Sequence, residues 1–261
     1  MAISIKSKKD IESLRIPNKI VAQTLKLLAQ RAKEGVSLLE LDTLANDFII
    51  SQGGRAAFYQ LYGFPKSICT SVNEVIIHGI PTDYKLKNGD ILGIDIGVDY
   101  GGWYGDGAIT LGIGQIKKSD EDLINCAKDS LYEAISQVRV GMRFKELSLV
   151  LEEAITKRGY EPLRGFCGHG IGRAPHEEPE IPNYLESPNP KQGPKIQEGM
   201  VFCLEPMIAQ RDGEPTILQD NWSVVAKDGL NGSHYEHTIA IVDGKAEILT
   251  AFVSSISSTS T

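Results

Sequence analysis

The chain of 261 residues is 41% hydrophobic and 23% charged, and its formal net charge is −7. That composition is typical of a globular protein with a sizeable core, and the acidic balance argues against a surface that binds nucleic acid. No segment approaches the roughly 18 consecutive apolar residues of a membrane-spanning helix, and the first residues lack the apolar run of a secretory signal.

The cysteine pattern bears on the compartment. Cys69, Cys126, Cys167 and Cys203 are widely spaced and form no CxxC pair. This spacing excludes a structural zinc finger and a compact disulfide framework. Because cysteines stay reduced in the cytosol, we expect a cytoplasmic protein.

Apolar residues recur at helical spacing over residues 20–32 and again over residues 39–48. The same pattern returns over residues 123–135 and 147–155. Spacings of three and four residues place apolar side chains on one face of a helix, so the sequence predicts two pairs of helices.

The helical pairs belong to an internal repeat. Residues 35–41 (GVSLLEL) align with residues 141–147 (GMRFKEL), and eighteen positions after each first glycine comes another, Gly53 or Gly159. Self-similarity at a fixed offset indicates two related structural units. Chance similarity is the alternative.

A strand signal repeats in the same order. Residues 89–95 (GDILGID) resemble residues 199–205 (GMVFCLE), each with an opening glycine, an apolar run and an acid six positions later. Further on, Asp106 and Glu236 each stand three positions before an isoleucine that begins an apolar alternation. We therefore predict an α+β fold of two pseudo-symmetric halves, with antiparallel sheet in the middle and helices outside.

The repeat also predicts the domain organisation. A single catalytic domain is expected over residues 1–252, with halves at about 11–115 and 119–252. Residues 253–261 are rich in serine and threonine and are expected to be disordered.

Four acids stand at equivalent points of the two halves: Asp95, Asp106, Glu205 and Glu236. A lone buried carboxylate is costly, and one such acid is ordinarily explained by backbone amides or an arginine. Four acids on apolar strands that face each other need a compensating charge. Divalent cations are the simplest source of that charge, so the pattern predicts a metal site.

The histidines add a further ligand. Of the five, His169 lies between two glycines, whereas His78 and His176 lie in turn-like segments. Acidic ligands with one histidine suit Mn, Fe, Co or Zn. His234 and His237 flank Glu236, and we interpret both as non-catalytic.

Together these residues resemble the methionine aminopeptidases, in order and over almost the whole chain. The similarity is carried by residues 64–69 (FPKSIC), 73–81 (NEVIIHGIP), 89–95 (GDILGID), 104–106 (YGD), 167–179 (CGHGIGRAPHEEP), 205–207 (EPM) and 235–238 (YEHT). The resemblance implies the "pita-bread" fold of the M24 peptidases. Glu205 and Glu236 lie too close for the long insertion of type II relatives, and a cysteine-rich zinc extension is missing, so the bacterial type I form is expected.

The resemblance implies a role for each matching residue. Two divalent metal ions (Co, Mn, Fe, Zn or Ni) would be held by Asp95, Asp106, His169, Glu205 and Glu236, with Asp106 and Glu236 bridging the two ions. Glu205 would also carry the proton of the attacking water, and His78 and His176 would contact the substrate and the tetrahedral intermediate. The methionine pocket would consist of Phe58, Leu61, Phe64, Cys69 and Trp222.

The resemblance also implies the partners. The substrates would be N-terminal methionyl peptides and nascent chains with a small second residue. A monomer is expected, without nucleic acid or membrane binding, and a charged N-terminal segment is compatible with transient ribosome contact.

Three positions depart from the commonest family pattern. Gly97 stands where threonine is frequent, Gly107 where threonine or serine is usual, and Pro175 where many relatives have an aromatic residue. None of them is a predicted ligand. Pro175 leaves the shape of the methionine pocket open.

Three rival interpretations follow. A proline-specific dipeptidase or aminopeptidase P would share the five ligands, but those proteins usually have an extra N-terminal domain. A non-catalytic binding protein would have lost ligands that are intact here. A thiol hydrolase would use Cys69 or Cys167, for which the sequence shows no activating partner, and a buried cysteine that packs as a small hydrophobe is favoured.

Overall fold

The computed structural model describes residues 2–251, and the expected disorder of residues 253–261 lies outside them. The helices are α1 (Lys8–Arg31), α2 (Leu38–Ser51), the 3₁₀ helix η1 (Leu61–Gly63), α3 (Lys118–Gln137) and α4 (Phe144–Thr156). The strands are β1 (Arg55–Ala56), β2 (Cys69–Val72), β3 (Val75–Ile77), β4 (Ile91–Tyr100), β5 (Trp103–Gly112), β6 (Glu161–Pro162), β7 (Cys167–Gly170), β8 (Glu177–Pro182), β9 (Val201–Leu204), β10 (Met207–Ala209), β11 (Pro215–Ile217), β12 (Val224–Ala226), β13 (Ser233–His234), β14 (His237–Val242) and β15 (Lys245–Ile248).

Both predicted pairs of helices are present. The first helices of the chain begin at capping boxes, in which Ser7 pairs with Asp10 ahead of α1 and Ser37 pairs with Glu40 ahead of α2. Each serine hydroxyl accepts a hydrogen bond from a first-turn amide, which has no partner inside the helix. Within residues 2–251, no helix combines the length and the apolar character needed to cross a membrane.

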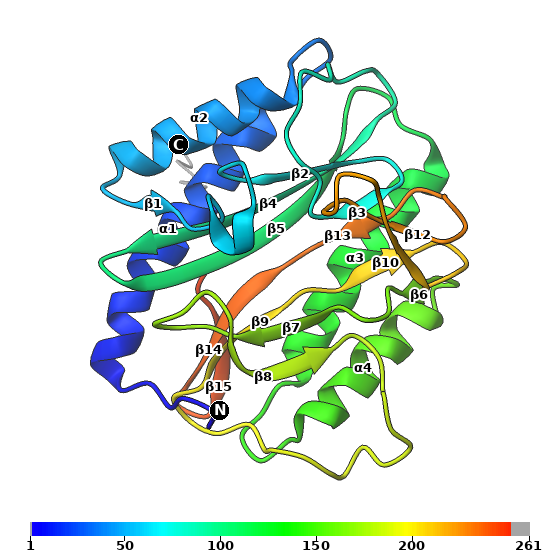
Figure 1. Cartoon of the computed structure of the whole chain (residues 1–261). Helices are drawn as coiled ribbons and strands as arrows, with labels where there is room; N and C mark the ends of the chain where they lie inside the picture. The colour runs from blue at the N-terminus through cyan, green and yellow to red at the C-terminus, as the bar shows by residue number, and fades with distance from the viewer. Residues whose placement is uncertain (1, 252–261) are drawn as a thin grey trace, which may run out of the picture.

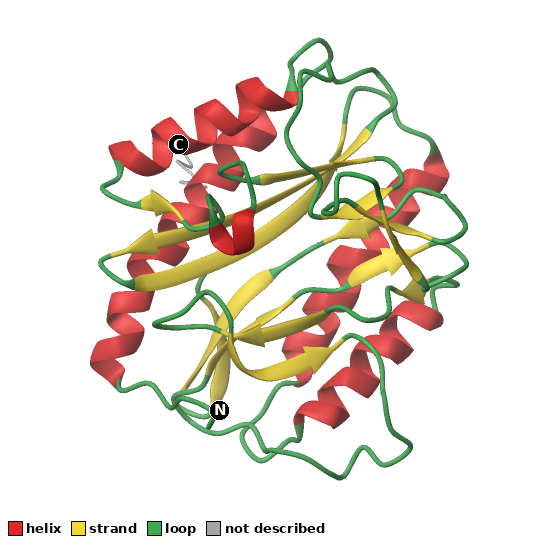
Figure 2. Cartoon of the chain, in the orientation of Figure 1, coloured by secondary structure: helices red, strands yellow, loops and turns green. Residues whose placement is uncertain are grey.

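The sheets lie in the middle of the molecule and the helices cover them from outside, as Figures 1 and 2 show. Strand β4 pairs with β5 along its whole length and also with β1 and β2, and all these pairings are antiparallel. The second half contains the antiparallel sheet β15–β14–β9–β7–β8. Two three-stranded sheets, β13–β10–β6 and β11–β12–β3, complete the arrangement. This is the predicted α+β class with antiparallel sheet inside.

The internal repeat is visible in the backbone. Gly35 and Gly141 have φ angles of 87° and 89°. The amide of Gly35 donates to the carbonyl of Leu86 at 2.8 Å, and the amide of Gly141 donates to the carbonyl of Ile196 at 2.8 Å. Positive φ favours glycine, so the same turn explains both glycines. The half boundaries at 11–115 and 119–252 stay a prediction.

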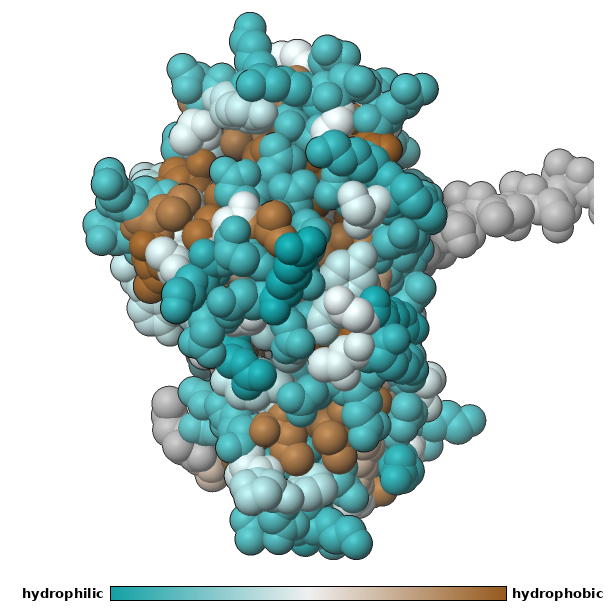
Figure 3. Space-filling view, turned by 90° about the vertical axis from the view of Figure 1, so that its right-hand side faces the viewer, coloured by the Kyte–Doolittle hydropathy of each residue, from teal (hydrophilic) through white to brown (hydrophobic). Residues whose placement is uncertain are grey.

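Each half has its own hydrophobic core. Leu28 of α1 packs in one cluster with Ile94 of β4, whereas Leu147 of α4 packs in another with Phe202 of β9. Burial of these side chains holds the outer helices on the sheets, at about 25 cal/mol per Å² of apolar surface. On the face shown in Figure 3, hydrophilic side chains predominate and hydrophobic ones form small scattered groups.

Candidate metal centre

The four predicted acids come from four neighbouring positions in the sheets. Asp95 lies in β4 and Asp106 in β5, while Glu205 directly follows β9 and Glu236 directly precedes β14. Oxygen atoms of Asp95, Asp106 and Glu236 all lie within 4.8 Å of one another. The two halves therefore bring their acids to one place, as the repeat predicts.

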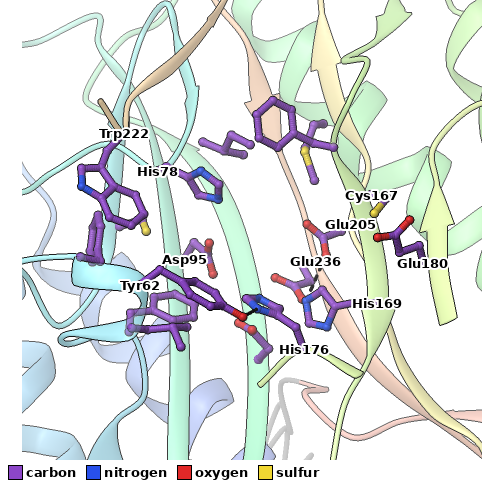
Figure 4. Close-up of a pocket in the computed structure, with 18 of the residues that line it drawn as sticks. Tyr62, His78, Asp95, Cys167, His169, His176, Glu180, Glu205, Trp222 and Glu236 are labelled. Atoms are coloured by element: carbon purple, nitrogen blue, oxygen red, sulfur yellow. Dashed lines mark hydrogen bonds and ion pairs between the residues drawn. The ribbon is translucent and has the colours of Figure 1, made fainter. Parts of the chain in front are cut away.

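The imidazole of His169 completes this cluster. Ligand atoms of Asp106, His169 and His176 lie within 4.8 Å of one another, and His169 Nε2 lies 3.4 Å from Glu205 Oε1. In Figure 4, Asp95 faces Glu205, Glu236 and His169 across the cavity.

The electrostatics of the cluster are dominated by burial. Asp106, Glu205 and Glu236 are 3%, 8% and 2% exposed. Loss of water raises the pKa of Asp95 to about 7. It also raises the pKa values of the other three acids well above their usual range, with repulsion between the carboxylates as the next cause. Carboxylates this close need protons or cations between them.

Several atoms of the cluster are buried without a hydrogen-bond partner among the described residues. These atoms are Asp95 Oδ1, Glu205 Oε1, Glu236 Oε1 and His234 Nε2. Buried polar atoms are almost always satisfied, so acceptors that point together at one spot need an explanation. Divalent cations satisfy them, and the residues present therefore fit a metal centre.

The tautomer of His169 supports the same conclusion. Its Nδ1 lies 3.0 Å from the carbonyl oxygen of Gly170, so Nδ1 carries the proton and donates it. Burial lowers the pKa of His169 to about 3, which keeps the ring neutral. Nε2 then presents a lone pair toward Glu205 Oε1, which is also an acceptor when the carboxyl group is ionised. Two acceptors at 3.4 Å fit a shared cation, and a backbone contact on the other ring nitrogen is typical of metal-binding histidines.

The cluster lies in the wall of a cavity of about 460 Å³. One side of this cavity is apolar, and the five residues predicted for the methionine pocket all line it: Phe58, Leu61, Phe64, Cys69 and Trp222. The rings of Phe64 and Trp222 meet edge to face, with centroids 5.1 Å apart. An apolar pocket thus opens beside the acids.

His78 and His176 line the same cavity. His176 meets His169 edge to face, with centroids 4.4 Å apart, and His78 packs in the same way on Phe166 at 5.8 Å. Burial lowers the pKa of His78 to about 4, so the neutral ring can offer an N–H. All the residues predicted for the site therefore lie on one cavity.

Sequence reasoning missed Tyr62, and His234 lies close to the site, while its interpretation as non-catalytic stays a prediction. Tyr62 lies at the cavity with its ring nearly parallel to that of His176, at an angle of 8° and a centroid distance of 5.9 Å. His234, which we had set aside as non-catalytic, places Nε2 3.8 Å from Glu205 Oε2. The position of His234 two residues before Glu236 was the available signal, whereas Tyr62 carried none.

The departures at Gly97 and Pro175 have different consequences. A Cβ on Gly97 would lie 2.5 Å from Cε1 of Phe58, so the absence of a side chain there makes room for the phenylalanine ring. Pro175 is outside the set of described residues that line the cavity. The pocket wall is thus shaped by the pair of Phe58 and Gly97.

The protonation of Cys69 and Cys167 argues against the alternative of a thiol hydrolase. Burial raises the pKa of Cys69 well above its usual value and raises that of Cys167 to about 12. The thiolate is the nucleophilic form, and a raised pKa suppresses it at neutral pH. These cysteines are therefore lining residues of the cavity.

Comparisons with known proteins agree with this geometry. The sequence model of Metallopeptidase family M24 matches residues 12–243. A methionine aminopeptidase from Helicobacter pylori is 63% identical over 251 residues, which cover 96% of this chain and 99% of that protein. The crystal structure of methionine aminopeptidase from Rickettsia prowazekii matches with a TM-score of 0.92 and 35% identity, covering 96% of this chain and 100% of that one.

The likeness extends to proline-specific enzymes at the level of the fold. A prolidase from Pyrococcus furiosus matches with a TM-score of 0.76 and 23% identity, covering 95% of this chain and 65% of that one. The predicted pita-bread fold is thereby confirmed. The chain belongs to metallopeptidase family M24 and, within it, to the methionine aminopeptidases.

Proposed function

We propose that this chain removes the N-terminal methionine from peptides and newly made proteins whose second residue is small. The observation that carries the proposal is the cluster of unpartnered carboxylate oxygens, which opens directly onto an apolar cavity. Such a site can activate water at one point and hold an unbranched apolar side chain next to it.

The metal content we propose is two divalent ions, which could be Co, Mn, Fe, Zn or Ni. Asp95 would chelate one ion, and His169 and Glu205 would hold the other. Asp106 and Glu236 would bridge the two, as their buried and mutually close carboxylates allow. When bound, two such ions lower the pKa of a water molecule from 15.7 toward about 7 and polarise a carbonyl group.

Glu205 is the proposed proton carrier. Its pKa is raised first by burial and then by the neighbouring carboxylates, so its carboxyl group holds a proton more readily than an ordinary glutamate does. It takes a proton from the attacking water. It then delivers a proton to the nitrogen of the leaving peptide as the C–N bond breaks.

His78 and His176 are proposed to bind the reacting amide. The pKa of His78 is lowered to about 4, so at neutral pH its ring offers an N–H without bringing a positive charge. His176 lies against His169, where the oxyanion of the tetrahedral intermediate would form. A preorganised donor at that point stabilises the transition state more than the substrate.

The apolar side of the cavity is proposed to hold the methionine side chain. Phe58, Phe64 and Trp222 supply aromatic surface there, and Leu61 and Cys69 fill the remaining wall. A thioether makes favourable contacts with aromatic rings, at about 0.3–1.5 kcal/mol each. A monomer and transient ribosome contact stay predictions from the resemblance, and a cytoplasmic location stays a prediction from the cysteine pattern.

A substrate panel tests this assignment. We expect release of methionine from Met-Ala-Ser, weak turnover of Leu-Ala-Ser, and no cleavage of Ala-Pro. The prolidase-like fold makes Ala-Pro the informative rival. Preferential cleavage of Ala-Pro would replace the proposal with a proline-specific peptidase.

A further inference from the structure

The two halves meet along β5 and the segment that contains β13 and β14, which run beside each other in Figure 1. At the centre, Ala108 and Glu236 exchange backbone hydrogen bonds: the amide of Glu236 donates to Ala108 at 2.8 Å, and the amide of Ala108 donates to Glu236 at 3.4 Å. In a regular antiparallel ladder, the residues two positions away on either side would form the next such pairs. They do not.

On one side of this centre, a threonine hydroxyl replaces the backbone partner. Thr238 Oγ1 donates to the carbonyl oxygen of Asp106 at 2.8 Å and accepts from the amide of Asp106 at 3.3 Å. The backbone of Thr238 is engaged elsewhere, with Thr250 Oγ1 and the amide of Leu249. Only the hydroxyl therefore reaches Asp106.

The other side repeats this arrangement with the halves exchanged. Thr110 Oγ1 donates to the carbonyl oxygen of His234 at 2.8 Å and accepts from the amide of His234 at 3.0 Å. His234 in turn approaches Glu205, with Nε2 3.8 Å from Oε2. One threonine hydroxyl of each half thus binds the backbone of a residue in the other half, close to the metal centre.

The packing around Thr238 makes this contact specific. Thr238 is fully buried, and Cys203 Sγ lies 3.4 Å from its hydroxyl oxygen. The single hydroxyl hydrogen goes to the carbonyl oxygen of Asp106, and the oxygen accepts from the amide of the same residue. A valine would fit the same space and make none of these bonds.

We propose that Thr238 is a positioning residue that fixes the backbone of Asp106, and thereby the spacing of Asp106 and Glu236 across the metal centre. The inference rests on the proposed function only in taking Asp106 and Glu236 as metal ligands. Thr110 fixes His234 beside Glu205 in the same way. The two hydroxyls hold the strands further apart than direct backbone pairing would. This separation leaves room between the carboxylates of Asp106 and Glu236.

The test is metal affinity, measured by calorimetric titration of Mn(II) into metal-free full-length protein. Thr238→Ser and Thr238→Ala differ only in the hydroxyl, and Thr238→Val keeps the volume without it. Thr70→Val is the matched control, because Thr70 is buried and its Oγ1 has no partner among the described residues. Thermal unfolding of each metal-free variant reports folding separately.

We expect Thr238→Ala and Thr238→Val to weaken Mn(II) binding by about 10–100-fold, as is usual when a group that orients a ligand is lost. Thr238→Ser and Thr70→Val should bind like the parent chain. Equal affinities for the serine and alanine variants would overturn the inference, even if the valine variant failed to fold. Methionine release by the parent chain is assayed in parallel, so a failure of the proposed function is recognised independently of the affinities.

Discussion

Phe58 and Gly97 share one space in the wall of the cavity: a Cβ on Gly97 would lie 2.5 Å from Cε1 and 2.9 Å from Cδ1 of the Phe58 ring. Gly97 is needed because a side chain would not fit, and not because of its backbone conformation. Its φ is not positive, unlike that of the described glycines at turns. Position 97 accommodates glycine because a Cβ there would collide with the ring of Phe58.

Gly97→Ala should therefore destabilise the protein by about 1–3 kcal/mol, the usual cost of overpacking. It should also raise KM for Met-Ala-Ser, because the displaced ring lies in the proposed methionine pocket. Urea unfolding and steady-state kinetics measure the two effects.

Phe58→Leu provides the control for this pair. The double variant should recover much of the lost stability, because residues in contact couple. Additive losses in the double variant would show that the two residues do not share the space.

Above about pH 7, where histidines are largely neutral in both the folded and the unfolded chain, the metal-free protein should lose stability as the pH rises. In the folded chain the pKa of Asp95 is about 7, and those of Asp106, Glu205 and Glu236 are higher than usual, whereas unfolded carboxyls titrate near 4. These carboxyl groups bind more protons in the folded state than in the unfolded state, so the stability that they contribute is fully present below about pH 4 and falls as the pH rises toward and past 7. In a chain of this size, each kcal/mol lost from the free energy of unfolding lowers the melting temperature by about 2–4 °C.

Thermal unfolding of metal-free protein between pH 7 and 9 measures this slope, with Asp106→Asn as the control that should flatten it. Added Mn(II) should reverse the trend, because metal replaces the protons. A melting temperature that climbs steadily from pH 7 to pH 9 without metal would be inconsistent with buried protonated acids.

Tyr62 should affect catalysis through His176. Loss of His176 itself should lower kcat by about 10²–10³-fold, the range for a donor to an oxyanion. Tyr62→Ala removes the ring that lies parallel to His176 and should lower kcat by a smaller factor, whereas Tyr62→Phe keeps the ring and should stay close to the parent. The result against this role would be equal kcat values for the alanine and phenylalanine variants.

The fold could be predicted where the structure depends on a residue and its immediate neighbours in the sequence. Gly35 and Gly141 could be matched from sequence because the same turn with positive φ needs glycine in both halves. The acids at residues 95, 106, 205 and 236 could be matched because they stand out in apolar strands. Helix starts were less visible, since Ser7 and Ser37 become caps only through contacts with the acid three positions later.

The rest of the site depends on contacts between distant segments. Tyr62 contacts His176 although the two residues are 114 positions apart in the sequence. Tyr62 lies in a short helix with a φ of 51°. No periodicity in the sequence predicts where its side chain points. The contact of Phe58 with Gly97 likewise joins the segment after β1 to the distant strand β4. Sequence patterns report which face of an element is buried, but not which two faces meet.

The most direct test of the account is release of free methionine from Met-Ala-Ser by metal-stripped protein, before and after addition of Co(II) or Mn(II). The Glu205→Ala variant is assayed beside it, and circular dichroism confirms that both are folded. We expect that release returns with metal in the parent chain and stays at background in the variant. Folded parent protein that releases no methionine with any added metal, or a variant as active as the parent, would contradict it.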